Sequence, residues 1–406
     1  MPNTLLTPTI ITKEALRIFE NELVLANKVD RQYDDRFAKE GAKIGTSLQI
    51  RRPVEYTVRS GATASAQDVL ENNHTISVST QRGIDFSFSS AELTLTVENF
   101  SDRYIKPAMV RLANEVDSII AADMKNNIGN LVGTPGTTPA TALVLLQAGQ
   151  KLDENSTPRD NMRFAALNPA ANAAVVNGLT GLFHSGDRIE EQYEKGVIGQ
   201  GLGFKFHMSQ NVPVHTVGPL GGTPLVNGAL GASTWSETSS LVTDGWTASA
   251  ANRLKAGDVI TIAGVNAVNQ QTKQSTGALR QFVVTADANS DGSGNLTAVI
   301  RPAIISSGPY QNVSAAAADN AAITVVGTAA TAYPQNLAFH KSAFTLVTAD
   351  LEVPRGVDMA HREVYKNISM RFLRDYNSTS DTFLSRFDIL FGYKALRPEW
   401  ACRITG

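Results

Sequence analysis

The chain has 406 residues with a formal net charge of -2, and charged residues make up 18% of it. This length exceeds what one hydrophobic core usually holds, so more than one domain is expected. The balanced charge argues against a polyelectrolyte-binding protein, because counterion release requires clustered lysine and arginine. The only cysteine, Cys402, cannot form an internal disulfide, and no cysteine and histidine cluster has zinc spacing. We therefore expect neither a metal nor another cofactor.

Residues 1–40 predict an extended, proline-containing arm followed by a helix. The arm has too few apolar residues to fold alone and so would need a partner surface. The helix is expected from Thr12, placed as its N-cap, to about Phe37. Its apolar residues recur at three- and four-residue spacing: Leu16, Phe19, Leu23 and Ala26.

The same N-terminal residues, MPNTLLTPTIITKEALRIF, do not resemble a signal peptide. They lack a basic segment followed by an apolar core and a small-residue cleavage site. No stretch of the chain approaches the roughly 20 apolar residues that span a bilayer. We expect a soluble protein of a reducing cytoplasm that has no membrane partner.

Residues 45–97 carry the two-residue alternation of β-strands. A polar segment, RSGATASAQDVLENN, separates the run SLQIRRP from two later runs with alternating apolar residues: Ile76 and Val78, then Ile84, Phe86 and Phe88. We interpret this region as a long β-hairpin with a large exposed tip; an ordinary hairpin at a sheet edge is the alternative. Because a two-stranded hairpin is marginal in water by itself, a long one predicts support from another molecule.

Residues 98–134 predict one long helix that opens at Ser101. A helix of about 25 residues would be near 37 Å long at about 1.5 Å per residue. Pro107 is tolerable only near the helix start or as a kink. One helical stripe is expected to be buried: Tyr104, Ala108, Leu112, Val116, Ile119 and Met124.

The remaining chain predicts an α+β unit with an insertion. In residues 135–216, Thr138-Pro139 and Asn168-Pro169 each look like an N-cap followed by proline at the first helical position. Residues 217–332 carry short β runs between glycine, asparagine and serine turns, which predict a small inserted β-barrel or sandwich. Residues 333–406 return to strands, and these must complete the unit begun before the insertion.

This order of elements resembles the α+β fold of Hong Kong 97-type capsid proteins, and more closely that of podovirus coat proteins with an inserted (I) domain. Three segments carry the resemblance: GQGLGFKFHMSQNVP (199–213), KAGDVITIAGVNAV (255–268) and SRFDILFGYKALRPE (385–399). The resemblance implies an N-arm and N-terminal helix at 1–40, an E-loop hairpin at 45–97 and a peripheral-domain spine helix at 98–134. It further implies an axial domain at 135–216, the I-domain at 217–332, and C-terminal strands at 333–406 that complete the axial and peripheral domains.

The resemblance also implies a function, that of a tailed-phage major capsid protein without catalytic activity. Hexamers and pentamers of the chain would form an icosahedral shell with a scaffolding protein and a portal, assembled in the host bacterial cytoplasm. Such a virion shell encloses double-stranded DNA without sequence-specific binding. An encapsulin-like nanocompartment shell is the alternative, against which the insertion argues. A carbohydrate-active enzyme or adhesin is a third class, but paired carboxylates in a recognisable motif and an export signal are missing.

Three short motifs hint at chemistry, and each has a simpler explanation. Asp287, Asn289 and Asp291 match the opening of a calcium loop, but Ala298 stands where a bidentate glutamate is required, so a hairpin turn is favoured. GQGLG lacks the full dinucleotide-binding spacing and predicts a tight turn. The run 184–187, HSGD, has the residue types of a catalytic triad in adjacent positions, whereas real triads converge from separated segments.

The predicted hairpin carries charges but no lysine. None occurs between Lys43 and Lys106, so the isopeptide cross-link that some capsid proteins of this fold form at the hairpin tip is not expected. Complementary charges fix the register between protomers. The charged residues of the hairpin are therefore candidate inter-subunit contacts, with a solvated loop as the alternative: Arg51, Arg52, Arg59, Asp68 and Glu71.

Overall fold

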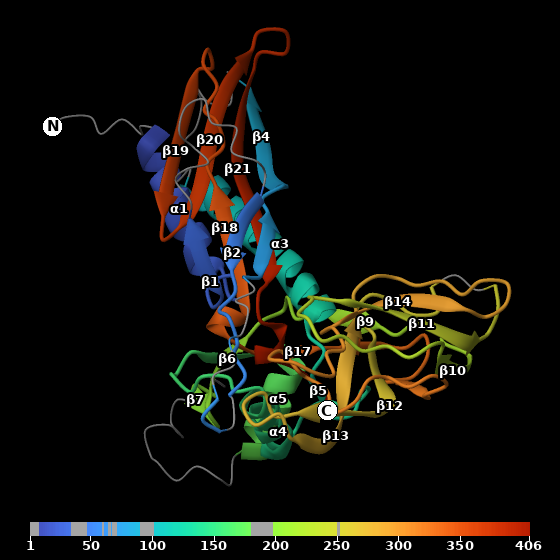
Figure 1. Ribbon diagram of the computed structural model, residues 1–406. Coiled ribbons are helices and arrows are strands. Elements are labelled where there is room, and N and C mark those ends of the chain that lie inside the picture. Colours follow the sequence, from blue (N-terminus) through green and yellow to red (C-terminus); the bar gives the residue numbers. More distant parts are fainter. Residues whose placement is uncertain are drawn as a thin grey trace. The chain divides into compact units, whose positions relative to one another are not determined.

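A computed structural model describes residues 8–33, 47–58, 61–63, 66, 71–89, 101–179, 198–249 and 252–406. The chain forms two compact units (Figure 1). Unit 1 consists of Met1–Ile50, Asn73–Ile120 and Phe344–Lys394, and unit 2 of Arg51–Asn72, Ala121–Ala343 and Ala395–Gly406. Each unit therefore gathers segments that are far apart in the sequence.

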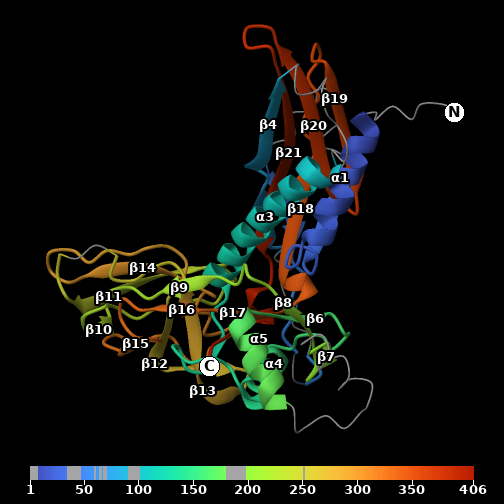
Figure 2. The ribbon, with the colours of Figure 1, turned by 180° about the vertical axis from the view of Figure 1, so that it is seen from behind.

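Unit 1 is built on a six-stranded sheet in the order β1-β18-β21-β20-β19, with β4 also paired to β21. Strand β1 runs parallel to β18, whereas β19, β20 and β21 form an antiparallel meander. Figure 2 shows helices α1 and α3 on the same face of this sheet. The elements are α1 (Pro8–Glu22), β1 (Asp30–Tyr33), β2 (Ser47–Arg51), β3 (Asn73–Ser77), β4 (Thr80–Ser89), α3 (Lys106–Asn127), β18 (Phe344–Ala349), β19 (Met359–Tyr365), β20 (Ile368–Asn377) and β21 (Thr382–Ala395). The residues of α3 from Ala121 onward belong to unit 2.

Helix α1 differs in its limits from the predicted helix. It begins at Pro8, where proline suits the first helical turn, and Thr12 lies inside it rather than capping it. It ends at Glu22, because the following backbone N–H groups donate to the carboxylate of Asp117 instead of to helical carbonyls. Helix α1 packs against β19 and β20 of the same chain. The four residues of the predicted apolar stripe are all buried: Leu16, Phe19, Leu23 and Ala26. Residues 1–7 of the predicted arm, for which a partner surface was expected, lie outside the described residues.

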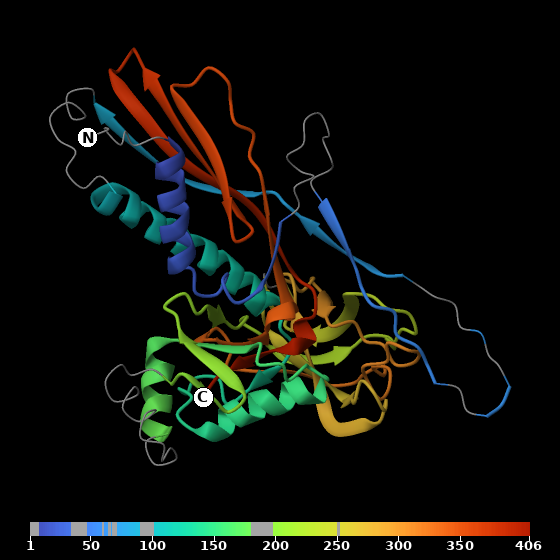
Figure 3. The same cartoon turned by 90° about the vertical axis from the view of Figure 1, so that its left-hand side faces the viewer.

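The predicted long hairpin is only partly correct. Strands β2 and β3 form a separate two-stranded sheet, visible side by side in Figure 3. Strand β4 instead pairs with β21, from Thr80 opposite Phe391 to Ser89 opposite Thr382. Its alternating aromatic residues favour this partner, since the Phe86 ring lies 6.1 Å from that of Phe387. The sequence marks β4 as a strand but does not indicate which strand it joins.

Helix α3 is preceded by one π-helical turn, Ser101–Ile105, so that Pro107 falls in the first turn of the α-helix. The 22 residues of α3 correspond to about 33 Å. The predicted stripe is partly correct: Leu112, Val116 and Met124 are buried, Ala108 and Ile119 are half-buried, and Tyr104 is 45% exposed. The other apolar residues buried on this helix and its first turn are Ile105, Met109, Ala113, Ile120 and Ala121.

Unit 2 contains a mixed six-stranded sheet in the order β5-β22-β17-β6-β8-β7, with helices α4 and α5 packed in the same core. Strand β22 lies between β5 and β17, so the C-terminal segment completes this sheet, as predicted. Strands β18 to β21, by contrast, belong to the sheet of unit 1. The elements are β5 (Leu131–Val132), α4 (Ala142–Glu154), β6 (Arg163–Leu167), α5 (Pro169–Leu179), β7 (Gln200–Gly201), β8 (Phe204–Met208), β17 (Asn336–His340) and β22 (Ala401–Ile404).

One of the two predicted helix starts is confirmed. The side chain of Asn168 accepts a 2.8 Å hydrogen bond from the backbone N–H of Ala171 and caps α5. The prediction at Thr138-Pro139 is wrong, because α4 begins only at Ala142. The carbonyl of Thr137 accepts a hydrogen bond from the N–H of Gly406, so this segment is held by the C-terminus rather than by a helix.

The inserted segment forms an antiparallel sheet in the order β10-β11-β14-β13-β12-β15 around its own core. Its two end strands meet, since Leu225 bridges to Ala322 and the N–H of Val226 donates to the carbonyl of Ala321, which closes a small barrel. Strands β9 (Val214–Thr216) and β16 (Ala332–Pro334) pair with each other where the chain enters and leaves the barrel. The other strands are β10 (Gly222–Val226), β11 (Ser239–Trp246), β12 (Val259–Val268), β13 (Ser275–Val284), β14 (Leu296–Arg301) and β15 (Ile323–Val325).

Candidate functional site

The described histidines and the cysteine do not converge on a reactive centre. His215, His340 and His361 each lie beside one carboxylate, on Asp258, Asp160 and Glu363 respectively. Burial raises the pKa of the Cys402 thiol to about 12, which keeps it protonated and unreactive. Within the described ranges no group of three or more His, Cys, Asp and Glu residues could hold a metal ion. The run 184–187 lies outside the described residues.

The calcium-like segment uses its oxygens to fix the backbone of a turn. Asp291 accepts hydrogen bonds from the N–H groups of Ser293 and Asn295, at 2.7 and 2.8 Å, and these bonds lower the pKa of its carboxyl. Asp287 and Asn289 accept from backbone N–H groups of the neighbouring loop. The favoured interpretation, a hairpin turn between β13 and β14, is confirmed.

The segment GQGLG is also a turn, as predicted. Gln200 and Gly201 pair with Lys205 and Phe204 across a two-residue connection. Leu202 has φ 51° and Gly203 has φ 82°, the left-handed geometry of a tight antiparallel turn. This turn closes the edge of the mixed sheet.

The candidate contact residues of the hairpin have different surroundings. Arg51 and Glu71 pair with each other at 3.4 Å, and both are exposed. Arg52 has an exposed side-chain fraction of only 16% and lies 3.4 Å from Glu399 of the same chain. Arg59 and Asp68 lie outside the described residues. Among the described candidates, Arg52 is the one whose side chain is largely buried against its own chain.

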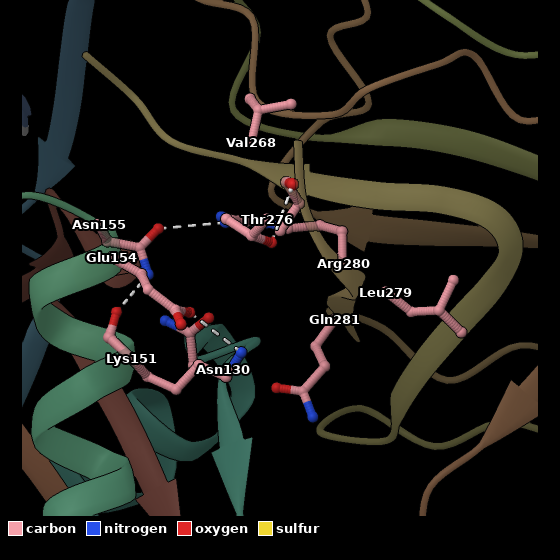
Figure 4. A pocket seen from close by; sticks show the side chains of 10 residues that line it. Asn130, Lys151, Glu154, Asn155, Val268, Thr276, Leu279, Arg280 and Gln281 are labelled. Atoms are coloured by element: carbon pink, nitrogen blue, oxygen red, sulfur yellow. Dashed lines mark hydrogen bonds and ion pairs between the residues drawn. The ribbon is translucent and has the colours of Figure 1, made fainter. Parts of the chain in front are cut away.

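Polar side chains join the barrel to the rest of unit 2, and we call this contact the seam: Arg280, Gln281, Arg301, Arg403, His215 and Asp258. Strand β13 supplies two of these residues, Arg280 and Gln281. Gln281 donates to the carbonyl of Leu131 and accepts from its N–H, at 3.0 and 2.8 Å, as a neighbouring strand would. Arg280 donates to Asn155 at 3.1 Å across the cleft that Figure 4 shows between β13 and α4. Burial lowers the pKa of Arg280, with opposing attraction from Glu399 and Glu154. Two consecutive side chains thus attach the barrel to the end of α4 and to strand β5.

The same seam contains a fully buried arginine. Arg403 donates from Nη1 to the carbonyl of Gly257 at 2.7 Å, and burial lowers the pKa of its guanidinium to about 10. Close by, Nε2 of His215 lies 2.7 Å from Asp258, whose carboxylate also accepts from the N–H of Lys255. Strand β9, strand β22 and the barrel are therefore joined by charged and polar groups rather than by an apolar contact alone.

We expect the stability of this seam to depend on pH through His215. Burial lowers the pKa of His215. The carboxylate of Asp258 opposes this shift, whereas the positive charges of Arg403 and Lys125 add to it. Below the ordinary histidine pKa the unfolded chain therefore binds a proton that the folded chain does not, and stability is lost as the pH falls toward the lowered value. Urea unfolding between pH 8 and pH 5 should show a smaller loss for His215→Gln, which can still donate to Asp258. Equal losses in both proteins would contradict this role.

Arg301 completes the seam at the end of β14. Its Nη1 donates to Asn127 at 2.7 Å and its Nη2 to the carbonyl of Ala395 at 2.9 Å. Glu237 lies 3.9 Å from the same guanidinium. Burial lowers the pKa of Arg301, and Glu237 opposes that effect first. One barrel residue thereby holds both the end of α3 and the start of the C-terminal segment.

Sequence reasoning did not identify the seam residues. A signal was available, because each is a charged or amide side chain within an otherwise apolar strand: Arg280 and Gln281 in LRQFVV, Arg301 in LTAVIR, and Arg403 in ACRI. Buried charges are rare unless they are paired, so such interruptions indicate a specific partner. The partner itself, 150 residues away for Gln281 and Leu131, cannot be found from local sequence.

The chain is similar to several known proteins. The chain is 24% identical over 421 residues to the major capsid protein of Acyrthosiphon pisum secondary endosymbiont phage 1, covering 98% of this chain and 97% of that one. A structure from Mycobacterium phage Che8 is 15% identical with a TM-score of 0.49, covering 94% of this chain and 90% of that one. The CUS-3 coat protein I-domain is 31% identical over 26% of this chain and 97% of its own, with a TM-score of 0.20.

Helices packed on mixed and antiparallel sheets, with a separate antiparallel barrel inserted between them in the sequence, define a protein of α+β class. The family model described as P22 coat protein, gene protein 5, matches residues 2–406. The chain therefore belongs to the P22 coat protein family, a family of structural capsid proteins and not of enzymes. Its elements form two units, and the second unit carries the inserted barrel. None of the helices in the described ranges is long and apolar enough to cross a membrane.

Proposed function

We propose that this chain is the subunit of an icosahedral phage head, in which it forms hexamers and pentamers. The observation that carries the proposal is the match of residues 2–406 to a coat protein family. The same match favours a phage coat over a nanocompartment shell. In this function the shell is made around a scaffolding protein in the host cytoplasm, carries a portal at one vertex and encloses double-stranded DNA.

Exposed apolar side chains support self-association. Leu143 and Leu146 are exposed and lie one helical turn apart on α4. Tyr376 and Leu384 are exposed at the ends of β20 and β21. Contacts of this kind are individually weak, but a closed shell repeats them many times, and linked sites turn modest affinities into a stable assembly.

The balanced charge supports DNA enclosure without strong DNA binding. The formal charge is -2, and the described cations of the seam are buried and paired with carboxylates, amides or carbonyls. Strong nucleic-acid binding would require clustered basic residues on the surface. We therefore assign the containment of the genome to the closed shell and not to a basic lining.

Expression of the chain with and without a cognate scaffolding protein, followed by negative-stain electron microscopy, tests the proposal. Closed particles of uniform size are expected with the scaffold, and fewer or irregular ones without it. Mass spectrometry of native particles should find a portal and a scaffold. A packaged enzyme would instead indicate a nanocompartment, and a chain that stays monomeric at high concentration under both conditions would refute a shell function.

A further inference from the structure

The first residues after β2 contact the barrel through one arginine. The guanidinium of Arg52 lies 5.3 Å from the ring centroid of Trp235 and 5.8 Å from that of Tyr310. Its Nη2 lies 3.4 Å from Glu399, and its backbone N–H donates to the carbonyl of Asn72 at 2.8 Å. Cation–π contacts gain strength when the cation is partly desolvated, and here the side chain is only 16% exposed. Arg52 is thus held on both aromatic and acidic groups.

A second attachment follows three residues later. The backbone N–H of Glu55 donates to the hydroxyl of Tyr310 at 3.3 Å, so Tyr310 contacts both positions. The carboxylate of Glu55 lies 3.7 Å from Nζ of Lys273, which is on the loop between β12 and β13. The pKa of Lys273 is lowered by burial, with Glu55 opposing this effect. The segment 52–55 is therefore fixed to the barrel at two points.

Beyond these attachments the chain presents unpacked apolar side chains. Tyr56 is 62% exposed and Val58 is 99% exposed. An exposed segment that must become ordered on binding loses conformational entropy, and fixing its base beforehand lowers that cost. Residues 52–55 directly precede the exposed Tyr56 and Val58. The orientation of residues 52–55 therefore sets the direction in which these two side chains point.

We propose that Arg52 is a positioning residue for assembly: the Trp235 and Tyr310 edge of the barrel clamps residues 52–55 and so presents residues 56–58 to a second copy of the chain. The proposal rests on the shell function proposed above. It gives the inserted barrel a role in orienting an assembly element in addition to bracing its own subunit. Glu399 favours arginine at this position because its carboxylate and the two rings engage different parts of a planar guanidinium.

Hydrogen–deuterium exchange of the unassembled chain tests the clamp directly. Arg52→Ala should accelerate exchange of the amides of residues 54–58 roughly tenfold, the size expected from losing a desolvated cation–π contact and an ion pair. Arg52→Lys should give an intermediate rate. Arg51→Ala is the matched control, because Arg51 is adjacent, 77% exposed and forms its ion pair with the exposed Glu71, so this variant should exchange like wild type. Equal rates for Arg52→Ala and Arg51→Ala would overturn the clamp.

Assembly kinetics then test its purpose. Shell formation, followed by light scattering, should be slower for Arg52→Ala than for wild type at equal thermal stability of the two monomers. Faster exchange with unchanged assembly would overturn the positioning role. Tyr310→Phe removes only the hydroxyl that accepts from Glu55 and should accelerate exchange of that amide selectively. Absence of shells from wild-type protein would refute the shell function instead, while the exchange experiment would still decide on the clamp.

Discussion

Replacement of Asp117 by alanine is expected to lower the free energy of unfolding by about 3–5 kcal/mol, because it leaves three backbone donors without their acceptor. The carboxylate of Asp117, on α3, accepts hydrogen bonds from the N–H groups of Val24, Leu25 and Ala26 at 2.7, 3.1 and 2.8 Å. Only 1% of Asp117 is exposed, so water cannot take its place in the folded chain. Urea unfolding followed by fluorescence measures the loss.

A matched control lies two residues earlier on the same helix. Glu115 is exposed and makes one 3.5 Å ion pair with Arg82. Glu115→Ala should change the free energy of unfolding by less than about 1 kcal/mol, as is usual for a surface pair. Asp117→Asn should fall between the two, because one amide oxygen still accepts while the amide nitrogen cannot. A loss for Asp117→Ala as small as that for Glu115→Ala would contradict the capping role.

Asp117 also illustrates what the sequence could and could not predict. The apolar periodicity of the N-terminal helix correctly selected its buried residues, because that signal is local. The end of the helix depends on a carboxylate more than 90 residues away, so a helix extending to about Phe37 was the wrong prediction. Turn chemistry was equally local, and both the Asn168 cap and the turn at Leu202 and Gly203 were found.

Strand partners and polar contacts escaped prediction for a common reason. An alternating pattern shows that a strand has one buried face, but any strand with a complementary face satisfies it, so β4 could be assigned to the hairpin although it joins β21. Arg51 and Arg52 are identical residues in adjacent positions. Side chains alternate along an extended segment, so only one of them faces the barrel, and the sequence does not show which.

The second large effect is expected at the seam, where Arg301→Ala should destabilise unit 2 by about 3–5 kcal/mol, the usual loss when one partner of a buried charged network is removed. Arg301 donates to the half-buried side chain of Asn127 and to the buried carbonyl of Ala395, and alanine would leave both acceptors without this donor. The side chain is 6% exposed, so solvent screening does not reduce the effect. The free energy of unfolding from urea titration, and the soluble yield at 37 °C, measure the change.

Thr297→Ala supplies the control for Arg301, because Thr297 is exposed on the same strand and should change stability by no more than about 0.5 kcal/mol. Arg301→Met separates shape from charge: it keeps an unbranched side chain of similar length but donates no hydrogen bond. If the seam works through its polar contacts, Arg301→Met should resemble Arg301→Ala. If Arg301→Met is as stable as wild type, packing alone is sufficient at this position. In other proteins, apolar residues have replaced buried ion pairs without loss of stability.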